Sequence, residues 1–118
     1  MTNANQWLGK YGEDRACEYL AGLGYQILDR NWRWREGELD IVASQSSTLV
    51  FVEVKTRTSL AHGSPLEAIT TTKLSRMRRS AASWCAQRQV QNTQVRFDAI
   101  AVLVRAGRVS VEHLKQVL

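Results

Sequence analysis

Three short stretches of the sequence carry the residues whose types and spacing could do chemistry. These are Gly12-Glu13, Gly37-Glu38-Leu39-Asp40 and Glu53-Val54-Lys55. The last two lie in apolar, strand-like runs, where a charge is costly unless it pairs or binds a metal. Because side chains alternate between the faces of a strand, Glu38 and Asp40 share one face. By the same rule Glu53, Lys55 and Arg57 share one face of their strand. If the two strands are neighbours, these charges form one cluster at an end of the sheet, a pattern that suggests a metal-dependent nuclease.

Such a cluster has the groups that phosphodiester hydrolysis needs. The reaction requires a cation that polarises the phosphoryl group, an activated water and neutralisation of developing charge. Mg²⁺ or Mn²⁺ takes oxygen ligands, which Asp40, Glu53 and the backbone carbonyl of Val54 could supply. Lys55 points from the same face as Glu53 and could orient the attacking water or stabilise the transition-state charge. Glu13, and also Glu38, could bind a second metal or support the ligands of the first.

Each of these residues, taken alone, is more often structural than catalytic. Lys55 and Glu53 could form an ordinary ion pair on a solvated edge, and Glu38 and Asp40 could be a turn acid and its neighbour. Their joint alignment, with each carboxylate on the needed face, favours the metal-binding interpretation.

The elements that must position these residues follow from hydrophobic periodicity and turn residues. In chain order we predict a helix from Asn5 to Leu23, strands Tyr25 to Trp34, Glu38 to Ala43 and Leu49 to Thr56, a helical region from Pro65 to about Arg88, a strand from Val95 to Val104, and a short edge strand from Val109 to Val111. Short connections favour antiparallel pairing of the first three strands. The fourth could return parallel to the third through the helical crossover. The fold class is therefore α/β, an α-β-β-β-α-β core with a mixed sheet flanked by helices.

The two helical regions carry their own signals. In the first, the apolar stripe consists of Ala16, Cys17, Leu20 and Leu23. Glu13 lies three and four residues before the first two of these, so it falls on the buried side of the helix, and Gly24 is a stop signal. In the second, the apolar stripe includes Leu66, Ile69, Met77, Ala81 and Trp84. The threonines at 70–72 are poor helix-interior residues and mark a break or a cap.

Length and composition limit the possible classes of protein. The 118 residues fit one domain, 1–118, and 16 Lys and Arg against 11 Asp and Glu leave a net charge of +5. A basic surface favours nucleic acid as a partner, with anionic membrane second, although this charge alone is weak evidence. No apolar run approaches the ~20 residues of a membrane span, so none is expected. Cys17 and Cys85 sit in helical patterns as free thiols, which together with a polar start favours a cytoplasmic protein.

Basic residues outside the acidic cluster are candidates for phosphate contacts. They are Arg33 and Arg35, which alternate with Trp32 and Trp34, together with Arg57 and the helical residues Lys73, Arg76 and Arg79. Aromatic and guanidinium groups can stack on bases and bind phosphates. The alternative, slightly favoured for the tryptophans, is that they pack against a helix. A solvated helix face is an equal alternative for the helical cations. His62, in a turn, is more often incidental in such a place, and Asp98 is interpreted as a buried or paired acid.

Several motifs resemble known nucleases. Asp40, then twelve residues, then Glu53-Val54-Lys55 resembles the D-(D/E)xK motif of restriction-endonuclease-like enzymes. Gly12-Glu13 in the first helix is similar to the branch that includes archaeal Holliday junction resolvases. The chain resembles the small bacterial YraN family more closely still. The motifs that carry this resemblance are Tyr11-Gly12-Glu13, Asn31-Trp32-Arg33, Gly37-Glu38-Leu39-Asp40 and Phe51-Val52-Glu53-Val54-Lys55-Thr56-Arg57. This resemblance runs from about Trp7 to Val104.

The resemblance implies a restriction-endonuclease-like fold and a metal-dependent endonuclease of structured or branched DNA. It implies metal ligation by Asp40 and Glu53, a catalytic role for Lys55 and a helix-borne acid in Glu13, with Mg²⁺ or Mn²⁺ as cofactor. A four-way junction has two symmetric cleavage points, so a resolvase-like role implies a two-fold homodimer. The alternatives are a nucleic-acid-binding module or scaffold that keeps the fold without cutting, and a structural subunit in which the cluster is a buried ion-pair network.

Overall fold

The computed structural model describes residues 4–59, 63 and 65–118. Its elements, in chain order, are α1 (Ala4–Gly22), β1 (Gln26–Trp34), β2 (Gly37–Gln45), β3 (Thr48–Arg57), the short 3-10 helix η1 (Pro65–Ala68), α2 (Thr71–Gln87), β4 (Gln94–Arg105) and β5 (Arg108–Leu114). The α/β order predicted from the sequence is confirmed.

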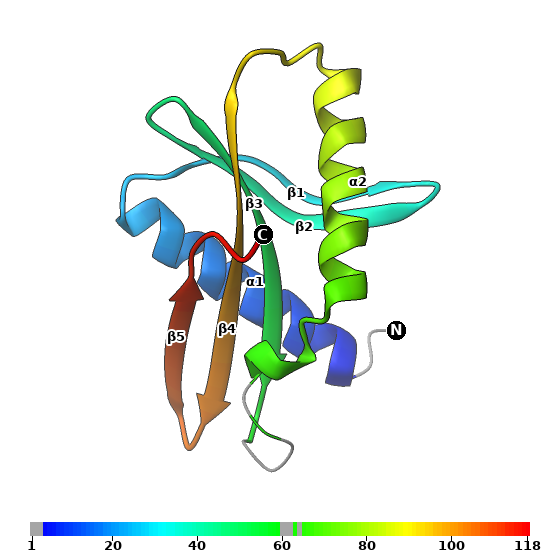
Figure 1. The fold of residues 1–118 in the computed structure, drawn as a ribbon. Helices are drawn as coiled ribbons and strands as arrows, with labels where there is room; N and C mark the ends of the chain where they lie inside the picture. The colour runs from blue at the N-terminus through cyan, green and yellow to red at the C-terminus, as the bar shows by residue number, and fades with distance from the viewer. Residues whose placement is uncertain (1–3, 60–62, 64) are drawn as a thin grey trace.

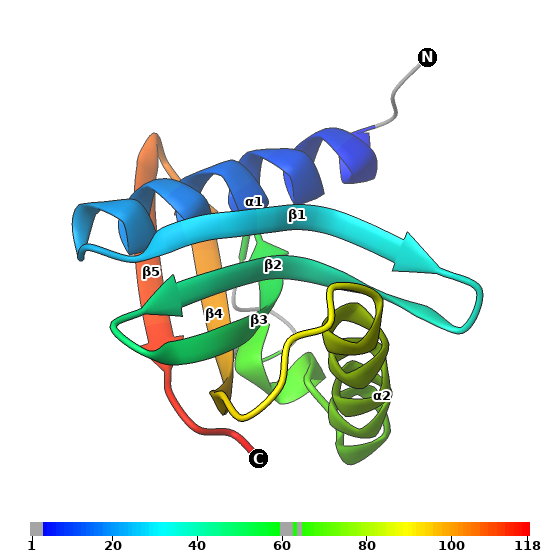
Figure 2. The same cartoon turned by 90° about the horizontal axis from the view of Figure 1, so that it is seen from above.

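The five strands form one mixed sheet in the order β1-β2-β3-β4-β5. β3 and β4 are parallel, as the helical crossover predicted, and the other neighbouring pairs are antiparallel. The helix α1 covers one face of the sheet and α2 covers the other (Figures 1 and 2). Two apolar cores follow, one between α1 and the sheet and one between α2 and the sheet.

The helix α1 packs on the sheet through the stripe that the sequence indicated. Ala16, Cys17 and Leu20 are buried in the α1-side core. Leu23 is an incorrect prediction, because the helix ends at Gly22 and the Leu23 side chain is 52% exposed. The stop signal itself is confirmed, since Gly24 has φ of 92° and the next residue donates its N–H back to the Leu20 carbonyl at 3.0 Å.

Gly12 lets α1 approach β3 at the end of the sheet that carries the candidate site. A Cβ at this position would overlap the Thr56 hydroxyl and methyl groups. The glycine of the Gly12-Glu13 motif is therefore a packing requirement, which brings the helix and Glu13 close to β3.

The predicted second helical region is divided by its threonines. Thr70 is the N-cap of α2, and its hydroxyl accepts the N–H of Lys73 at 3.2 Å. Leu66 and Ile69 therefore lie before α2 rather than on its apolar stripe, whereas Met77, Ala81 and Trp84 are buried as predicted. Neither helix of the described residues has the length and apolar character that crossing a membrane requires.

The tryptophans of β1 pack against α2, which confirms the structural interpretation of them. The Trp34 Nε1–H donates to the Ser80 hydroxyl at 2.8 Å, and Trp32 packs against the α2-side core. The two rings stack on one face of the strand, with centroids 6.4 Å apart.

Asp98 is a structural acid, as the sequence suggested. It is fully buried and accepts two hydrogen bonds from Arg96, both at 2.8 Å, and the N–H of Gln116 at 3.1 Å. The His113 Nε2 lies 2.7 Å from it, and the other ring nitrogen of His113 lies 3.1 Å from the Tyr19 hydroxyl. Burial alone would raise the pKa of Asp98, but the bonds from Arg96 and His113 outweigh it and lower the pKa. The network joins β4, β5 and α1.

Gly12→Ala should destabilise the fold by about 1–3 kcal/mol, because the added methyl group must displace α1 from Thr56. Gly22→Ala is the matched control, since a Cβ there has open space and alanine is the better helix former. Denaturant unfolding of the two variants measures the difference. Equal stability of both variants and the wild type would contradict the close approach of α1 to β3.

Candidate functional site

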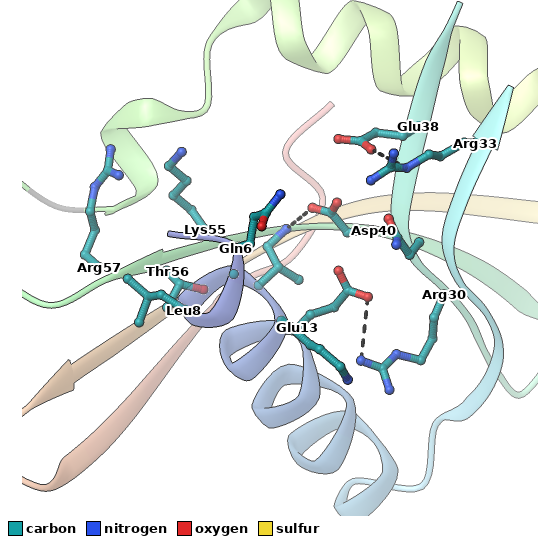
Figure 3. Close-up of a pocket in the computed structure, with 14 residues that line it drawn as sticks. Gln6, Leu8, Glu13, Arg30, Arg33, Glu38, Asp40, Lys55, Thr56 and Arg57 are labelled. Carbon is teal, nitrogen blue, oxygen red and sulfur yellow. Dashed lines mark hydrogen bonds and ion pairs between the residues drawn. The ribbon is translucent and has the colours of Figure 1, made fainter. Parts of the chain in front are cut away.

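The candidate site forms where β2 and β3 separate. Their pairing runs from Gln45 opposite Thr48 to Ile41 opposite Val52. One residue further, the Asp40 carboxylate accepts the backbone N–H of Val54 at 2.8 Å, so a side chain continues the ladder in place of a main-chain carbonyl (Figure 3). The bond fixes the direction of this carboxylate at the point where the strands part.

β2 also changes its facing direction at this point. Leu39 packs in the α2-side core, whereas Ile41, two residues on, packs in the α1-side core. In a regular strand two such residues share a face, so β2 twists strongly at Asp40. The twist places the Asp40 carboxylate at the boundary between the two faces of the sheet.

β3 supplies Glu53 and Lys55 by simple alternation. Val50 and Val52 point to the α1-side core and Phe51 points to the α2-side core, so Glu53 and Lys55 continue the face of Phe51. Both are partly buried. Glu53 and Lys55 line one hollow together with Asp40 of the neighbouring strand β2.

A cleft surrounds the separated strand ends on both sides. On the α1 side it is a hollow of about 990 Å³ and on the α2 side one of about 660 Å³. The two hollows share five lining residues, Arg33, Glu38, Asp40, Val54 and Lys55. The cleft is therefore continuous around Asp40 and Lys55.

Asp40 and Glu53 form the acidic centre of this cleft. The two carboxyl groups lie close enough for each to perturb the pKa of the other, so charging both at once is costly. Burial, and then the charge and hydrogen bond of Asp40, raise the pKa of Glu53 to about 8. Burial also raises the pKa of Asp40, against the bond from the Val54 N–H, which lowers it. The pair thus carries an electrostatic cost that a proton or a bound cation would relieve.

Glu13 approaches the same centre from α1. Its carboxylate lies 3.6 Å from the Arg30 guanidinium of β1, which also binds Asp14. Burial, and then the charge of Asp40, raise the pKa of Glu13 to about 7 in spite of Arg30. The expected position of Glu13 on the buried side of α1 is confirmed, since its side chain is 18% exposed.

Glu38 stands further out than the other acids. Its side chain is 55% exposed and lies 3.4 Å from the Arg33 guanidinium. Within the described ranges, no group of three or more His, Cys, Asp and Glu side chains lies close enough together to hold a metal ion. The tight acidic unit of the cleft is therefore the Asp40–Glu53 pair, with Glu13 and Glu38 flanking it.

Positive charge faces the acids across the cleft. In the α1-side hollow, the carboxyl groups of Glu38, Asp40 and Glu13 lie along one side, with Lys55 and Arg57 opposite (Figure 3). Burial, and then the charges of Lys73 and Arg57, lower the pKa of Lys55. An anion that entered the cleft would favour the charged form of Lys55 and so oppose this lowering.

The cations proposed from the sequence do not all reach the cleft. Arg33 and Arg57 line its α1 side, and Lys73 and Arg76 line its α2 side. Arg35 projects into solvent near Glu36, with 87% of its side chain exposed, and Arg79 is exposed on α2; neither lines the cleft. His62 lies outside the described residues.

The α1-side hollow is also lined by residues to which the sequence assigned no role at the site, among them Gln6, Lys10, Arg30 and Asn31. Lys10 precedes Glu13 by three residues, so helical spacing could have indicated that both face the same way. Asn31 belongs to the motif Asn31-Trp32-Arg33, which could have indicated it, whereas the place of Arg30 depends on how β1 packs beside α1.

The fold and the site agree on a class of protein. A mixed sheet flanked by two helices, with an acidic pair and a lysine where two strands separate, is compatible with a restriction-endonuclease-like core. The chain belongs to the uncharacterised protein family UPF0102, whose sequence profile matches residues 12–102. This is the YraN family that the motifs indicated.

Bacterial relatives match over nearly the whole chain. A UPF0102 protein of Beutenbergia cavernae is 51% identical over 115 residues, which cover 97% of this chain and 98% of the relative. One from Frankia casuarinae is 48% identical over 113 residues, covering 95% and 96%. One from Arthrobacter sp. strain FB24 is 48% identical over 115 residues, covering 97% and 98%.

The acidic pair should make the fold less stable as the pH rises. Glu53 has its pKa raised from 4.5 to about 8 in the folded chain, so the stability that its protonated form contributes is complete below pH 4.5 and is lost as the pH rises towards 8. Glu53→Gln should remove this loss. Near pH 8 its free energy of unfolding should exceed that of the wild type by about 1–3 kcal/mol, and near pH 4.5 the two should differ little.

Chemical denaturation at several pH values in a metal-free buffer measures the effect. Glu18→Gln is the control, because Glu18 is an exposed acid of α1 that pairs with Arg15. If the stability of the wild type and that of Glu53→Gln change with pH in the same way, the raised pKa of Glu53 is contradicted.

Proposed function

We propose that this protein is a metal-dependent endonuclease that acts on structured or branched DNA. The observation that carries the proposal is the Asp40–Glu53 pair, two partly buried carboxyls with raised pKa values at the separation of β2 and β3, which line one hollow together with Lys55. Raised carboxyl pKa values beside a charged partner in a cleft are typical of functional sites. The motif resemblance and the basic rim of the cleft support the same proposal.

The chemistry of the acidic pair fits a hard divalent cation. Mg²⁺ is commonly held by one or two carboxylates, with waters and substrate phosphate oxygens completing its shell. Asp40 and Glu53 would hold Mg²⁺ or Mn²⁺, with the Val54 carbonyl as a further ligand. Glu13 and Glu38 would support the shell or a second ion. When bound, the metal supplies charge neutralisation, polarisation of the phosphoryl group and a water of lowered pKa.

The chain's own residues would position the substrate and the proton transfers. Asp40 is oriented by the Val54 N–H before any ligand arrives, so its carboxylate needs no reorganisation. Lys55 faces the cleft with a lowered pKa, which suits it to orient the attacking water or to donate to the phosphoryl oxygen as negative charge develops. Glu13, held by Arg30, would accept a hydrogen bond from a water of the metal shell.

The rim of the cleft supports a polyanionic substrate. Arg33, Lys73 and Arg76 line the α2-side hollow and Arg57 the α1-side hollow, so cations flank the acidic pair on both faces of the sheet. DNA that turns around the strand ends would contact both sets, which a branched substrate does more readily than a straight duplex. The symmetric branch of a junction calls for a homodimer, and the free thiols of Cys17 and Cys85 support a cytoplasmic setting.

A second candidate, a nucleic-acid-binding module that does not cut, is favoured by one observation. Among the residues that the structure describes, the acids do not form a three-membered metal-binding group. A protein that only binds would keep the basic rim and would not need one. This candidate predicts DNA binding that is indifferent to metal and to Lys55.

A cleavage assay tests the proposal. Labelled four-way junction, flap, single strand and duplex are incubated with Mg²⁺, with Mn²⁺ or with a chelator. We expect cleavage of a branched substrate that requires metal and that falls at least about 100-fold in Lys55→Ala, because removing a group that stabilises transition-state charge costs roughly this much. Lys115→Ala, a change in the exposed tail, should cut like the wild type.

Binding without cleavage on every substrate and with either metal would favour the binding module. Cleavage that survives in Lys55→Ala, Asp40→Asn and Glu53→Gln would exclude this cleft as the active site. The same preparations are checked by circular dichroism, so that loss of cleavage is not confused with loss of the fold.

The basic rim predicts a specific salt dependence of binding. Lys73→Ala/Arg76→Ala should reduce the slope of log affinity against log salt by about 1.8, since each lost phosphate contact with duplex DNA removes about 0.9. Arg78→Ala/Arg79→Ala is the matched control, because these neighbours on α2 do not line the cleft. Fluorescence anisotropy titrations with junction DNA at several salt concentrations measure both slopes. A larger change in the control pair would place the DNA on another face of α2.

A further inference from the structure

β5 is an edge strand with features of a pairing surface. It forms one side of the sheet, and its register with β4 is regular over the whole length from Ala99 opposite Leu114 to Arg105 opposite Arg108. Within the described part of the chain, its outer edge has no strand partner. Regular edges of this kind are templates for another strand unless the sequence protects them.

The two edges of the sheet differ in the regularity of their strands. β1 has a shift of register between Ile27 and Asp29, which interrupts its edge, and it carries Arg30 and Arg33. β5 has no register shift and no proline or lysine; its charged residues are Arg108 and Glu112, and Val109 and Leu114 are 39% and 49% exposed. The regular β5 edge is therefore the one along which a further strand could pair over its whole length.

The charges of β5 indicate which partner fits. Arg108 lies directly opposite Arg105 in the β4–β5 hairpin, an unfavourable like-charge pair. Among the described residues neither Arg108 nor Glu112 has an ion-pair partner. Arg108 and Glu112 are an even number of residues apart, so they share one face of β5.

We propose that β5 pairs antiparallel with β5 of a second copy of this chain, about a two-fold axis at Ser110. In this register Arg108 lies opposite Glu112 of the second copy, and by symmetry Glu112 lies opposite its Arg108. On the other face, Val109 lies opposite Val111 of the second copy, which adds a β-branched pair at the edge of the α1-side core. The pairing joins two five-stranded sheets into one and is isologous, as a closed dimer requires.

Other symmetric registers lose these contacts. A two-fold axis at Val111 places Arg108 opposite Leu114 and Glu112 opposite Ser110. An axis at Val109 places Arg108 opposite Ser110. Ser110 on the axis is therefore the register that pairs both charges. The proposal goes beyond the nuclease function and stands whether or not the cleft cuts DNA.

Charge reversal tests both the surface and the register. Sedimentation velocity is run over protein concentrations of about 1 to 300 µM, the range in which a small interface should associate. The wild type should pass from monomer to dimer. Arg108→Glu alone and Glu112→Arg alone should each weaken the association about tenfold or more, because two attractive contacts per dimer become repulsive. The double variant Arg108→Glu/Glu112→Arg should restore it to within about threefold.

Folding controls keep the result interpretable. Arg108→Glu replaces the like-charge pair with Arg105 by an opposite-charge pair within one chain, so its melting temperature should not fall. A short bis-maleimide should cross-link Ser110→Cys into a dimer, whereas the exposed tail variant Lys115→Cys should stay monomeric. Three outcomes would overturn the proposal: a wild type that is monomeric throughout, single variants that associate like the wild type, or a double variant that is not rescued. Dimers that form without cross-linking of Ser110→Cys would overturn the register.

Discussion

The hydrogen bond from the Val54 N–H to the Asp40 carboxylate is the contact on which the cleft depends. It lies one residue past the last β2–β3 backbone pair, so it both ends the ladder and satisfies a donor that the ladder leaves open. Without it, the separated strand ends would need another acceptor or would close. The same bond holds one acid of the pair in a fixed direction, so the shape of the sheet and the geometry of the candidate site have a single origin.

The electrostatics of the site follow from that geometry. Separation of the strands exposes a depression in which Asp40 and Glu53 are brought together and partly withdrawn from water, at a cost seen in their raised pKa values. The buried acid Asp98, by contrast, is surrounded by donors and has a lowered pKa. The carboxylate of Asp98 is therefore surrounded by hydrogen-bond donors, whereas burial outweighs the hydrogen bonds of Asp40 and raises the pKa values of both Asp40 and Glu53. This contrast separates the structural carboxylate from the candidate functional ones more clearly than burial does.

Local patterns in the sequence predicted most of the fold. Alternation along β3 placed Glu53 and Lys55 on one face, helical spacing placed Glu13 on the buried side of α1, and short connections predicted antiparallel neighbours. The errors fall at ends and edges. The edge strand β5 is longer than predicted, and Leu23 lies outside α1, because strand pairing and helix termination depend on contacts that spacing does not encode.

The sequence by itself determined the element order and the family and indicated Asp40, Glu53 and Lys55 as candidate residues, because these depend on residue type and on periods of two and 3.6 residues. Only the tertiary structure decided which cations line the cleft. Arg35 and Arg79 are arginines like the nearby Arg33 and Arg76, but only Arg33 and Arg76 line the cleft. Arg30 reaches Glu13 because β1 runs beside α1. Side-chain direction at a strand twist and contact between distant segments arise from packing in three dimensions, which no local pattern records.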